Sequence, residues 1–95
     1  MTDRAKQLLI IEDDPAFAGI IKRRLEKHNI SCHHAVDKST ALLLAREVLP
    51  QYILLDMNLG QDNGLQLIKP LRTLLPKATI VLLTGFASIA TAVDA

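Results

Sequence analysis

The clearest indication of the fold is the segment Leu8-Leu9-Ile10-Ile11-Glu12-Asp13-Asp14-Pro15. Its apolar run, which does not alternate with polar residues, predicts a strand that is covered on both faces. Asp14 is a preferred helix N-cap, and Pro15 suits the first helical position because its missing N–H would have no partner there. This stretch therefore predicts a buried strand that passes at once into a helix, with Glu12 and Asp13 at the junction.

The rest of the chain repeats this alternation. Apolar runs predict further strands at residues 30–36, 52–56 and 78–83, and helical spacing predicts helices at 17–25, 41–48, 65–74 and 89–93. Asp37 and Ser88 are expected to cap the second and fourth helices. Pro70 lies inside the third helical pattern, and because it has no N–H to donate it should kink this helix or move its start.

Strands that alternate with helices imply a parallel sheet with helices on both faces, so the expected fold class is α/β, doubly wound. A chain of 95 residues has room for one domain, at residues 1–95. The first strand is not followed by a glycine-rich turn, and the chain has no G-x-x-x-x-G-K-[ST] loop. These absences argue against a nucleotide-binding version of this architecture.

Composition excludes several other classes. The 11 Lys and Arg residues against 10 Asp and Glu give a net charge of +1, whereas a strongly basic nucleic-acid binder needs a clear excess of cations. The apolar runs are too short to cross a membrane. The single cysteine, Cys32, cannot form an internal disulfide, and it is expected to be a buried strand thiol in a reducing, cytoplasmic compartment.

Polar residues follow the predicted strands in a way that suggests a site. The first strand ends in Glu12 and Asp13, the third in Asp56 and the fourth in Thr84. In sheets of this kind, sites form beyond the carboxyl ends of the strands, so these side chains are expected to converge. Three carboxylates so close together repel one another, and Mg²⁺ is a natural occupant. A carboxylate beside such a cation can act as the nucleophile toward a phosphoryl group.

At these residues the sequence resembles the receiver domain of bacterial two-component response regulators. The matching motifs occur in order from about residue 7 to 95. They are Leu9-Ile10-Ile11-Glu12-Asp13-Asp14, Ile53-Leu54-Leu55-Asp56-Met57-Asn58-Leu59, Asn63-Gly64-Leu65 and Ile80-Val81-Leu82-Leu83-Thr84-Gly85. The tracts at residues 13–18, 59–65 and 84–92 resemble more narrowly the redox-responding global regulators of the RegA type.

The resemblance implies a flavodoxin-like (CheY-like) fold with strand order 2-1-3-4 and specific roles for the residues of the site. Asp56 would be the phosphoacceptor for a sensor histidine kinase. Glu12, Asp13, Asp56 and the backbone carbonyl of Asn58 would hold Mg²⁺, and Thr84 would be the switch hydroxyl. The side chains of Asn58 and Phe86 would tune how fast the acyl phosphate is hydrolysed.

The resemblance also implies parts that this sequence does not contain. A fifth strand with an aromatic switch residue, a lysine and a fifth helix would all lie beyond Ala95. Without that lysine we expect weak phosphorylation. Without the fifth strand and helix we expect a bare edge on the fourth strand, uncovered apolar faces, and a tendency to form a homodimer or a domain-swapped dimer. DNA would be reached only through an effector domain outside these residues.

Other interpretations stay open. The first is a protein-interaction module that works without phosphorylation, which the missing lysine favours. The second is a hydrolase of small phosphate esters, but such enzymes carry a second Asp two residues past the nucleophile, where this chain has Asn58. A receiver would be a switch that acts on itself, not a turnover enzyme.

Residues outside the acidic cluster have simpler interpretations. His33 and His34 are adjacent in a strand, so they should point to opposite faces and cannot chelate one metal together. Arg23, Arg24 and Lys27 predict a solvated helix face, although the resemblance implies that the sensor kinase meets the receiver at this helix.

Overall fold

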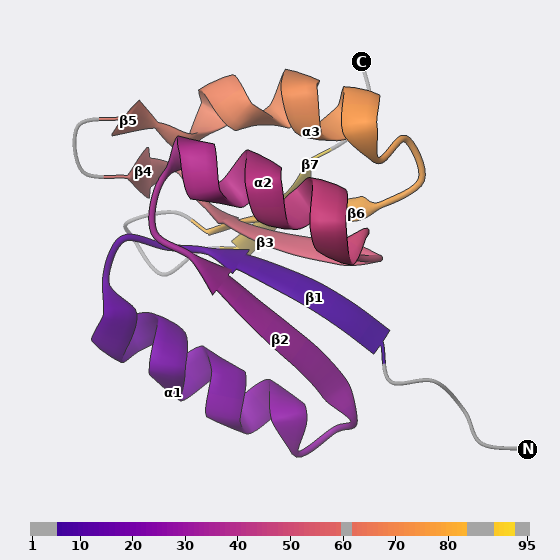
Figure 1. Ribbon diagram of the computed structural model, residues 1–95. Helices are drawn as coiled ribbons and strands as arrows, with labels where there is room; N and C mark the ends of the chain where they lie inside the picture. The colour runs from indigo at the N-terminus through magenta and orange to yellow at the C-terminus, as the bar shows by residue number, and fades with distance from the viewer. Residues whose placement is uncertain (1–5, 60–61, 84–88, 93–95) are drawn as a thin grey trace, which may run out of the picture.

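The computed structural model describes residues 6–59, 62–83 and 89–92 of the chain (Figure 1). Strands and helices alternate along most of it, as the apolar runs and helical spacing predict. The strands are β1 (Lys6–Ile11), β2 (Ile30–Ala35), β3 (Tyr52–Asp56), β4 (Asn58–Leu59), β5 (Asp62–Asn63), β6 (Thr79–Leu83) and β7 (Ile89–Ala92). The helices are α1 (Pro15–Glu26), α2 (Lys38–Val48) and α3 (Ile68–Leu74), with a 3₁₀ turn, η1 (Gly64–Leu67), before α3.

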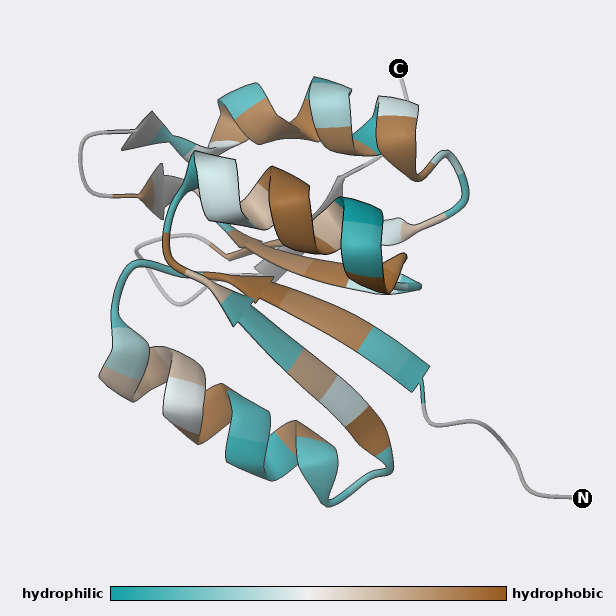
Figure 2. Ribbon diagram, in the orientation of Figure 1, coloured by the Kyte–Doolittle hydropathy of each residue, from teal (hydrophilic) through white to brown (hydrophobic). Residues whose placement is uncertain are grey.

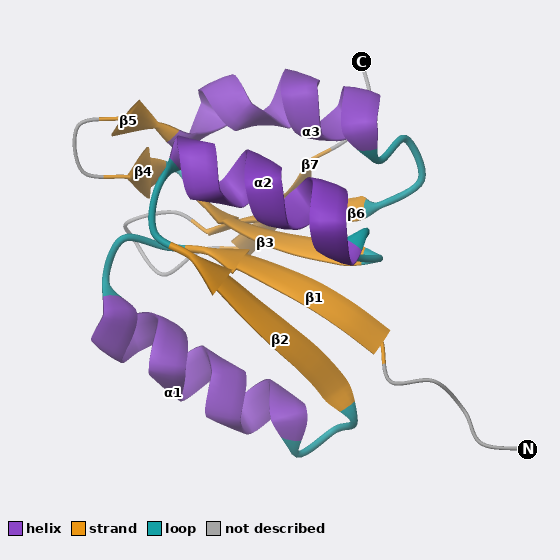
Figure 3. Ribbon diagram, viewed as in Figure 1, coloured by secondary structure: helices purple, strands orange, loops and turns teal. Residues whose placement is uncertain are grey.

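The main sheet has the order β2-β1-β3-β6-β7, and its first four strands run parallel (Figure 3). Since β6 is the fourth of the predicted strands, the expected order 2-1-3-4 and the doubly wound α/β class are confirmed. Strand β1 lies at the centre, where Ile10 pairs with His34 of β2 on one side and Leu54 of β3 on the other. The carboxyl ends of the parallel strands therefore meet at one edge.

Helices cover the two faces of the sheet unequally. Leu9 and Ile11 face one side and pack in a cluster with residues of α2 and α3, whereas Ile10 faces the other side and packs with Ala18 of α1. Figure 2 shows β1, beyond its teal first residues, and most of β3 in brown between these layers. Because both faces of β1 are covered, Leu9, Ile10 and Ile11 are all fully buried, which explains the unbroken apolar run.

Side-chain caps start α1 and α2 where the sequence predicts them. The Asp14 carboxylate accepts the N–H groups of Ala16 and Phe17 at 3.0 and 3.3 Å, with Pro15 at the first helical position. Asp37 accepts the Thr40 N–H at 2.8 Å. These bonds satisfy N–H groups that have no partner within the helix. The cap at Asp14 fixes where the chain turns after Glu12 and Asp13.

Pro70 moves the start of the third helix, which is one of the two predicted outcomes. The segment from Gly64 forms the 3₁₀ turn η1, and regular α-helix begins only at Ile68. Pro70 is then in the first turn of α3, where a backbone N–H would have no partner within the helix. The helix accommodates the proline because its start has shifted.

The prediction of a fourth helix at residues 89–93 is wrong. Residues Ile89–Ala92 form β7, which pairs antiparallel with β6, so that Val81 lies opposite Thr91. The open edge of β6 offers unpaired backbone groups, and pairing with them satisfies a short segment that contains β-branched Ile89 and Thr91. The expectation of a bare edge on β6 is therefore also wrong. The predicted cap, Ser88, lies outside the described residues.

An apolar cavity of about 370 Å³ lies between α1 and strands β1, β3 and β6. Phe17 of α1 lines it and is partly exposed. The expectation of uncovered apolar faces stays a prediction. Within the described ranges, no helix has the length and apolar character needed to cross a membrane.

Candidate metal centre

Three carboxylates meet at the carboxyl edge of the sheet. Glu12 and Asp13 directly follow β1, and Asp56 is the last residue of β3, the neighbouring strand. One carboxylate oxygen from each of the three lies within 4.8 Å of the others. The parallel pairing of Ile11 with Leu55 brings the two strand ends level, which explains the convergence. The predicted acidic cluster is confirmed as a geometric feature.

Glu12 is the buried member of the cluster, with 5% of its surface exposed. Its Oε2 accepts the N–H of Asp14 at 3.1 Å. Burial raises the pKa of Glu12 to about 8, and hydrogen bonds with the carboxylates of Asp56 and Asp13 and the charge of Asp56 add to this rise, against the opposing effect of the Asp14 N–H. Near neutral pH, the cluster alone therefore favours a proton on Glu12.

The donor set fits a hard divalent cation. All three groups offer oxygen, and a cation among them would stabilise the ionised carboxylates and offset the charge of Asp56 that adds to the raised pKa of Glu12. Asp13 is exposed and Asp56 is half-buried, so one side of the cluster opens to solvent. Mg²⁺ binds in this manner, through a few carboxylates while it keeps several waters. Glu12, Asp13 and Asp56 can therefore hold Mg²⁺.

Among the described residues, only Glu12, Asp13 and Asp56 of the predicted site residues are shown to meet in the cluster. The backbone of Asn58 lies in β4, two residues past Asp56, and pairs with Asn63 of β5. Its carbonyl as a metal ligand stays a prediction. Thr84 and Phe86 lie outside the described residues. The proposed roles of these two side chains thus rest on the sequence motifs alone.

Gly64 supports the site in a way that the sequence did not reveal. Its N–H donates to the carbonyl of Met57 at 2.9 Å, and its α-carbon faces the backbone of Asp56. A Cβ at this position would overlap the Asp56 carbonyl oxygen and lie 2.9 Å from the Met57 α-carbon. The sequence marked this position only as a turn-forming Asn63-Gly64 pair within the Asn63-Gly64-Leu65 motif, and neither signal predicts the contact with Asp56.

The two neighbouring histidines point to opposite faces of the sheet, as predicted. His33 pairs with Leu9 and His34 with Ile10, and these partners belong to the two different core clusters. The Nε2 atom of His33 lies 2.8 Å from Gln7 Oε1, whereas His34 Nε2 lies 2.6 Å from the backbone oxygen of Glu12. The two rings therefore do not share one ligand.

Cys32 is the buried strand thiol that the sequence predicts. It is 5% exposed and packs with Ile10 and Ala18 on the α1 face. Burial raises the pKa of the Cys32 thiol, the charge of Glu26 adds to the rise, and Lys22 opposes it. These surroundings favour the unreactive thiol over the thiolate.

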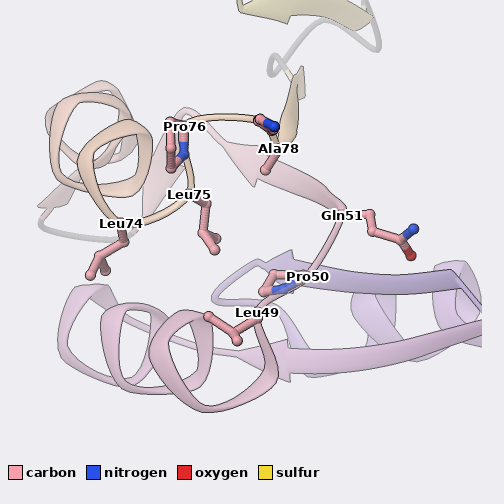
Figure 4. Close-up of a pocket in the computed structure, with 8 residues that line it drawn as sticks. Leu49, Pro50, Gln51, Leu74, Leu75, Pro76 and Ala78 are labelled. Atoms are coloured by element: carbon pink, nitrogen blue, oxygen red, sulfur yellow. The ribbon is translucent and has the colours of Figure 1, made fainter.

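A second cavity lies at the opposite end of the sheet (Figure 4). It has a volume of about 340 Å³ and is formed by the loops that lead into β3 and β6. Its lining is mostly apolar and consists of Leu49, Pro50, Gln51, Leu74, Leu75, Pro76, Lys77 and Ala78. None of these lining residues carries a carboxylate, so the candidate metal centre is the acidic cluster at the other end of the sheet.

The relatives that the chain matches are regulatory proteins. It is 37% identical over 90 residues to the photosynthetic apparatus regulatory protein RegA of Rhodobacter capsulatus, covering 95% of this chain and 49% of the relative. The acid tolerance regulatory protein ActR of Sinorhizobium medicae is 32% identical over 90 residues, covering 95% of this chain and 46% of ActR. The chain thus spans about half the length of these relatives, and the narrower resemblance to RegA-type regulators is confirmed.

Solved structures with the same fold lead to the same family. A response regulator from Burkholderia pseudomallei, described with a phosphorylated aspartic acid, calcium ion and citrate, superposes with a TM-score of 0.83 at 43% identity, covering 87% of this chain and 49% of that one. A CheY-like receiver domain from Methylobacillus flagellatus superposes with a TM-score of 0.78 at 31% identity. The match covers 85% of this chain and 70% of that one. The family model described as the response regulator receiver domain matches residues 8–95, and the chain therefore belongs to the response regulator receiver family.

Proposed function

We propose that this chain accepts a phosphoryl group on Asp56 from a phosphohistidine of a sensor histidine kinase, with Mg²⁺ held by Glu12, Asp13 and Asp56. The observation that carries the proposal is the meeting of the three carboxylates within 4.8 Å at the carboxyl edge of the sheet. Asp56 is suited to the acceptor role because it is half-buried at the end of β3 and faces the other two acids. The phosphorylated aspartic acid of the Burkholderia pseudomallei relative supports this choice.

The transfer needs little from the protein beyond position and charge. One carboxylate oxygen of Asp56 forms a bond to phosphorus, while the P–N bond to the donor histidine breaks and its imidazole leaves with the electron pair. Bound Mg²⁺ would supply electrostatic stabilisation of the negative charge on the phosphoryl oxygens. Glu12 and Asp13 would bind the cation next to Asp56. The backbone carbonyl of Asn58 is the proposed fourth protein ligand.

The phosphoryl group would act as a signal. The Thr84 hydroxyl is proposed to hydrogen-bond the bound phosphoryl group, and Asn58 and Phe86 to tune its hydrolysis. The receiver would work in the cytoplasm and control transcription through an effector domain that binds DNA. Arg23 and Arg24 of α1 and its C-cap residue Lys27 are exposed and are proposed to contact the kinase.

The intact cluster favours this function over an interaction module that works without phosphorylation. Such a module has no need to gather three carboxylates at a place where burial, with added contributions from Asp56 and Asp13, raises the pKa of Glu12 to about 8. A receiver needs them, because they hold the cation and supply the acceptor. No further candidate function has a comparable observation in its favour.

The test is the intact mass of the protein after treatment with acetyl phosphate and Mg²⁺. We expect wild type to gain one phosphoryl group, and Asp56→Asn and a sample with chelator to gain none. Asp37→Asn is the matched control, because Asp37 is an acid after the neighbouring strand β2 that caps α2 instead of joining the cluster. Equal labelling of Asp56→Asn and wild type would contradict the proposal.

A further inference from the structure

A histidine of the neighbouring strand contacts the backbone of the metal centre. His34 Nε2 lies 2.6 Å from the backbone oxygen of Glu12. A carbonyl oxygen can only accept, so Nε2 carries the hydrogen and donates it. His34 pairs with Ile10, and its side chain therefore reaches along the α1 face to the turn that follows β1.

This bond completes the attachment of Glu12 to β2. The last paired residues of β1 and β2 are Ile11 and Ala35, and Glu12 lies one position beyond them. Its N–H donates to the Ala35 carbonyl at 2.9 Å, and its carbonyl accepts from His34. Both backbone groups of Glu12 are thus held by β2, although β2 contributes no carboxylate to the cluster.

We propose that His34 is a positioning residue of the metal centre, which holds the turn at Glu12 and Asp13 so that their carboxylates face Asp56. This inference rests on the proposed function, because it assigns His34 a part in Mg²⁺ binding. His34 does not ligate the cation. Its Nε2 hydrogen is directed at a carbonyl, and its effect passes through the backbone of Glu12.

The expected consequence of removing the donor follows from the burial of Glu12, which is 5% exposed. A carbonyl at such a position that loses its partner moves toward another donor or toward water. The turn would then shift, and with it the carboxylates that converge within 4.8 Å. Substitution of residues that orient metal ligands weakens metal affinity about tenfold or more.

His33 provides a matched control within the same strand. It is half-buried like His34, and its Nε2 also lies at hydrogen-bond distance from an oxygen, Gln7 Oε1. That oxygen belongs to Gln7 near the start of β1, at the other end of the strand from Glu12, and it lies on the opposite face of the sheet. A His33→Leu substitution therefore removes a comparable bond and a comparable ring without touching the turn.

The experiment compares wild type, His34→Leu, His34→Gln and His33→Leu. Calorimetric titration with Mg²⁺ alone gives the affinity of each protein, and urea unfolding shows that each is folded. We expect His34→Leu to bind Mg²⁺ about tenfold more weakly. His34→Gln should bind nearly as wild type does, since its amide offers a donor at a similar reach, and His33→Leu should bind as wild type does.

A second measurement on metal-free protein tests the bond itself. Loss of the His34 donor should move the NMR chemical shift of the Glu12 carbonyl carbon and speed the hydrogen exchange of the Asp14 amide, and His34→Gln should reverse both.

The inference is overturned if His34→Leu keeps wild-type affinity, if His33→Leu weakens binding equally, or if His34→Gln rescues nothing. If wild type itself binds no Mg²⁺, the proposed function fails and the inference with it. If wild type binds but His34→Leu does so equally well, only the inference fails.

Discussion

Gly64 lies so close to Asp56 that a methyl group on its α-carbon would overlap the Asp56 carbonyl oxygen. The Gly64 N–H also donates to the carbonyl of Met57, at 2.9 Å. The start of η1 is therefore packed directly on the backbone of the proposed phosphoacceptor. Any side chain at residue 64 has to push this backbone away from its place.

A Gly64→Ala substitution should destabilise the fold and slow phosphorylation. Forcing extra atoms into a packed site costs about 1–3 kcal/mol, and here the obstacle is backbone, which cannot rotate aside. Urea unfolding measures the free energy, and the rate of mass gain with acetyl phosphate measures the effect on Asp56. The control is Gly19→Ala in α1, whose Cβ would meet only Arg23 Nη1 at 3.9 Å. The free energy of unfolding of Gly19→Ala should rise by about 0.5–1 kcal/mol. If Gly19→Ala destabilised the protein as Gly64→Ala does, the close packing at Gly64 would not be the cause.

The metal-free protein should lose stability as pH rises from about 4.5 to about 8. The pKa of Glu12 is raised from 4.5 to about 8, so in this range the folded state binds more protons than the unfolded state. Raising the pH then lowers the free energy of unfolding, and the loss levels off above the folded pKa. Urea unfolding at a series of pH values in the presence of chelator measures the slope. Glu12→Gln should flatten it, and an unchanged slope in that variant would show that another group is responsible.

Cys32 should resist alkylation in the folded protein. It is 5% exposed, and burial raises the pKa of its thiol, so little thiolate is available at neutral pH. It is also the chain's only cysteine, so all labelling reports on this site. We expect slow reaction with a thiol reagent in buffer and fast reaction in urea. Equally fast reaction in both would contradict the buried position of Cys32.

Asp14 should prove to be a structural residue and not a metal ligand. Its carboxylate accepts two N–H groups at the start of α1, and Asp14→Ala should lower stability by about 1 kcal/mol. Asp14→Ser keeps an N-cap acceptor and should restore most of the loss. Mg²⁺ affinity should change little in Asp14→Ser. A large loss of Mg²⁺ binding in that variant would place the Asp14 carboxylate among the ligands.

Much of the fold could be predicted because its signals are local. The unbroken run before Glu12 predicted a doubly covered strand, and Asp14 with Pro15 predicted the helix start. The convergence of Glu12, Asp13 and Asp56 followed from one general rule, that parallel strands present their carboxyl ends at one edge. Pro70 likewise predicted, from the properties of its own ring, either a kink or a shifted helix start, and the structure has the shifted start.

The remainder depends on partners that are distant in the chain. The segment Ile89–Ala92 contains two alanines, which favour helix, and two β-branched residues, which favour strand, and the open edge of β6 decides between them. The contact of His34 with Glu12 spans 22 residues and depends on the register of β1 and β2. No motif marks it, and two adjacent histidines suggested only a chelation that strand geometry rules out.

Whether the three carboxylates form one cation site is tested by Mg²⁺ titration of wild type and of the variants Glu12→Gln, Asp13→Asn and Asp56→Asn. If the three carboxylates form one site, wild type should bind a single Mg²⁺, and each variant should bind it more weakly. Asp37→Asn, which removes an acid outside the cluster, should bind as wild type does. Saturable binding that survives all three substitutions, or no binding by wild type, would show that Glu12, Asp13 and Asp56 do not form a Mg²⁺ site.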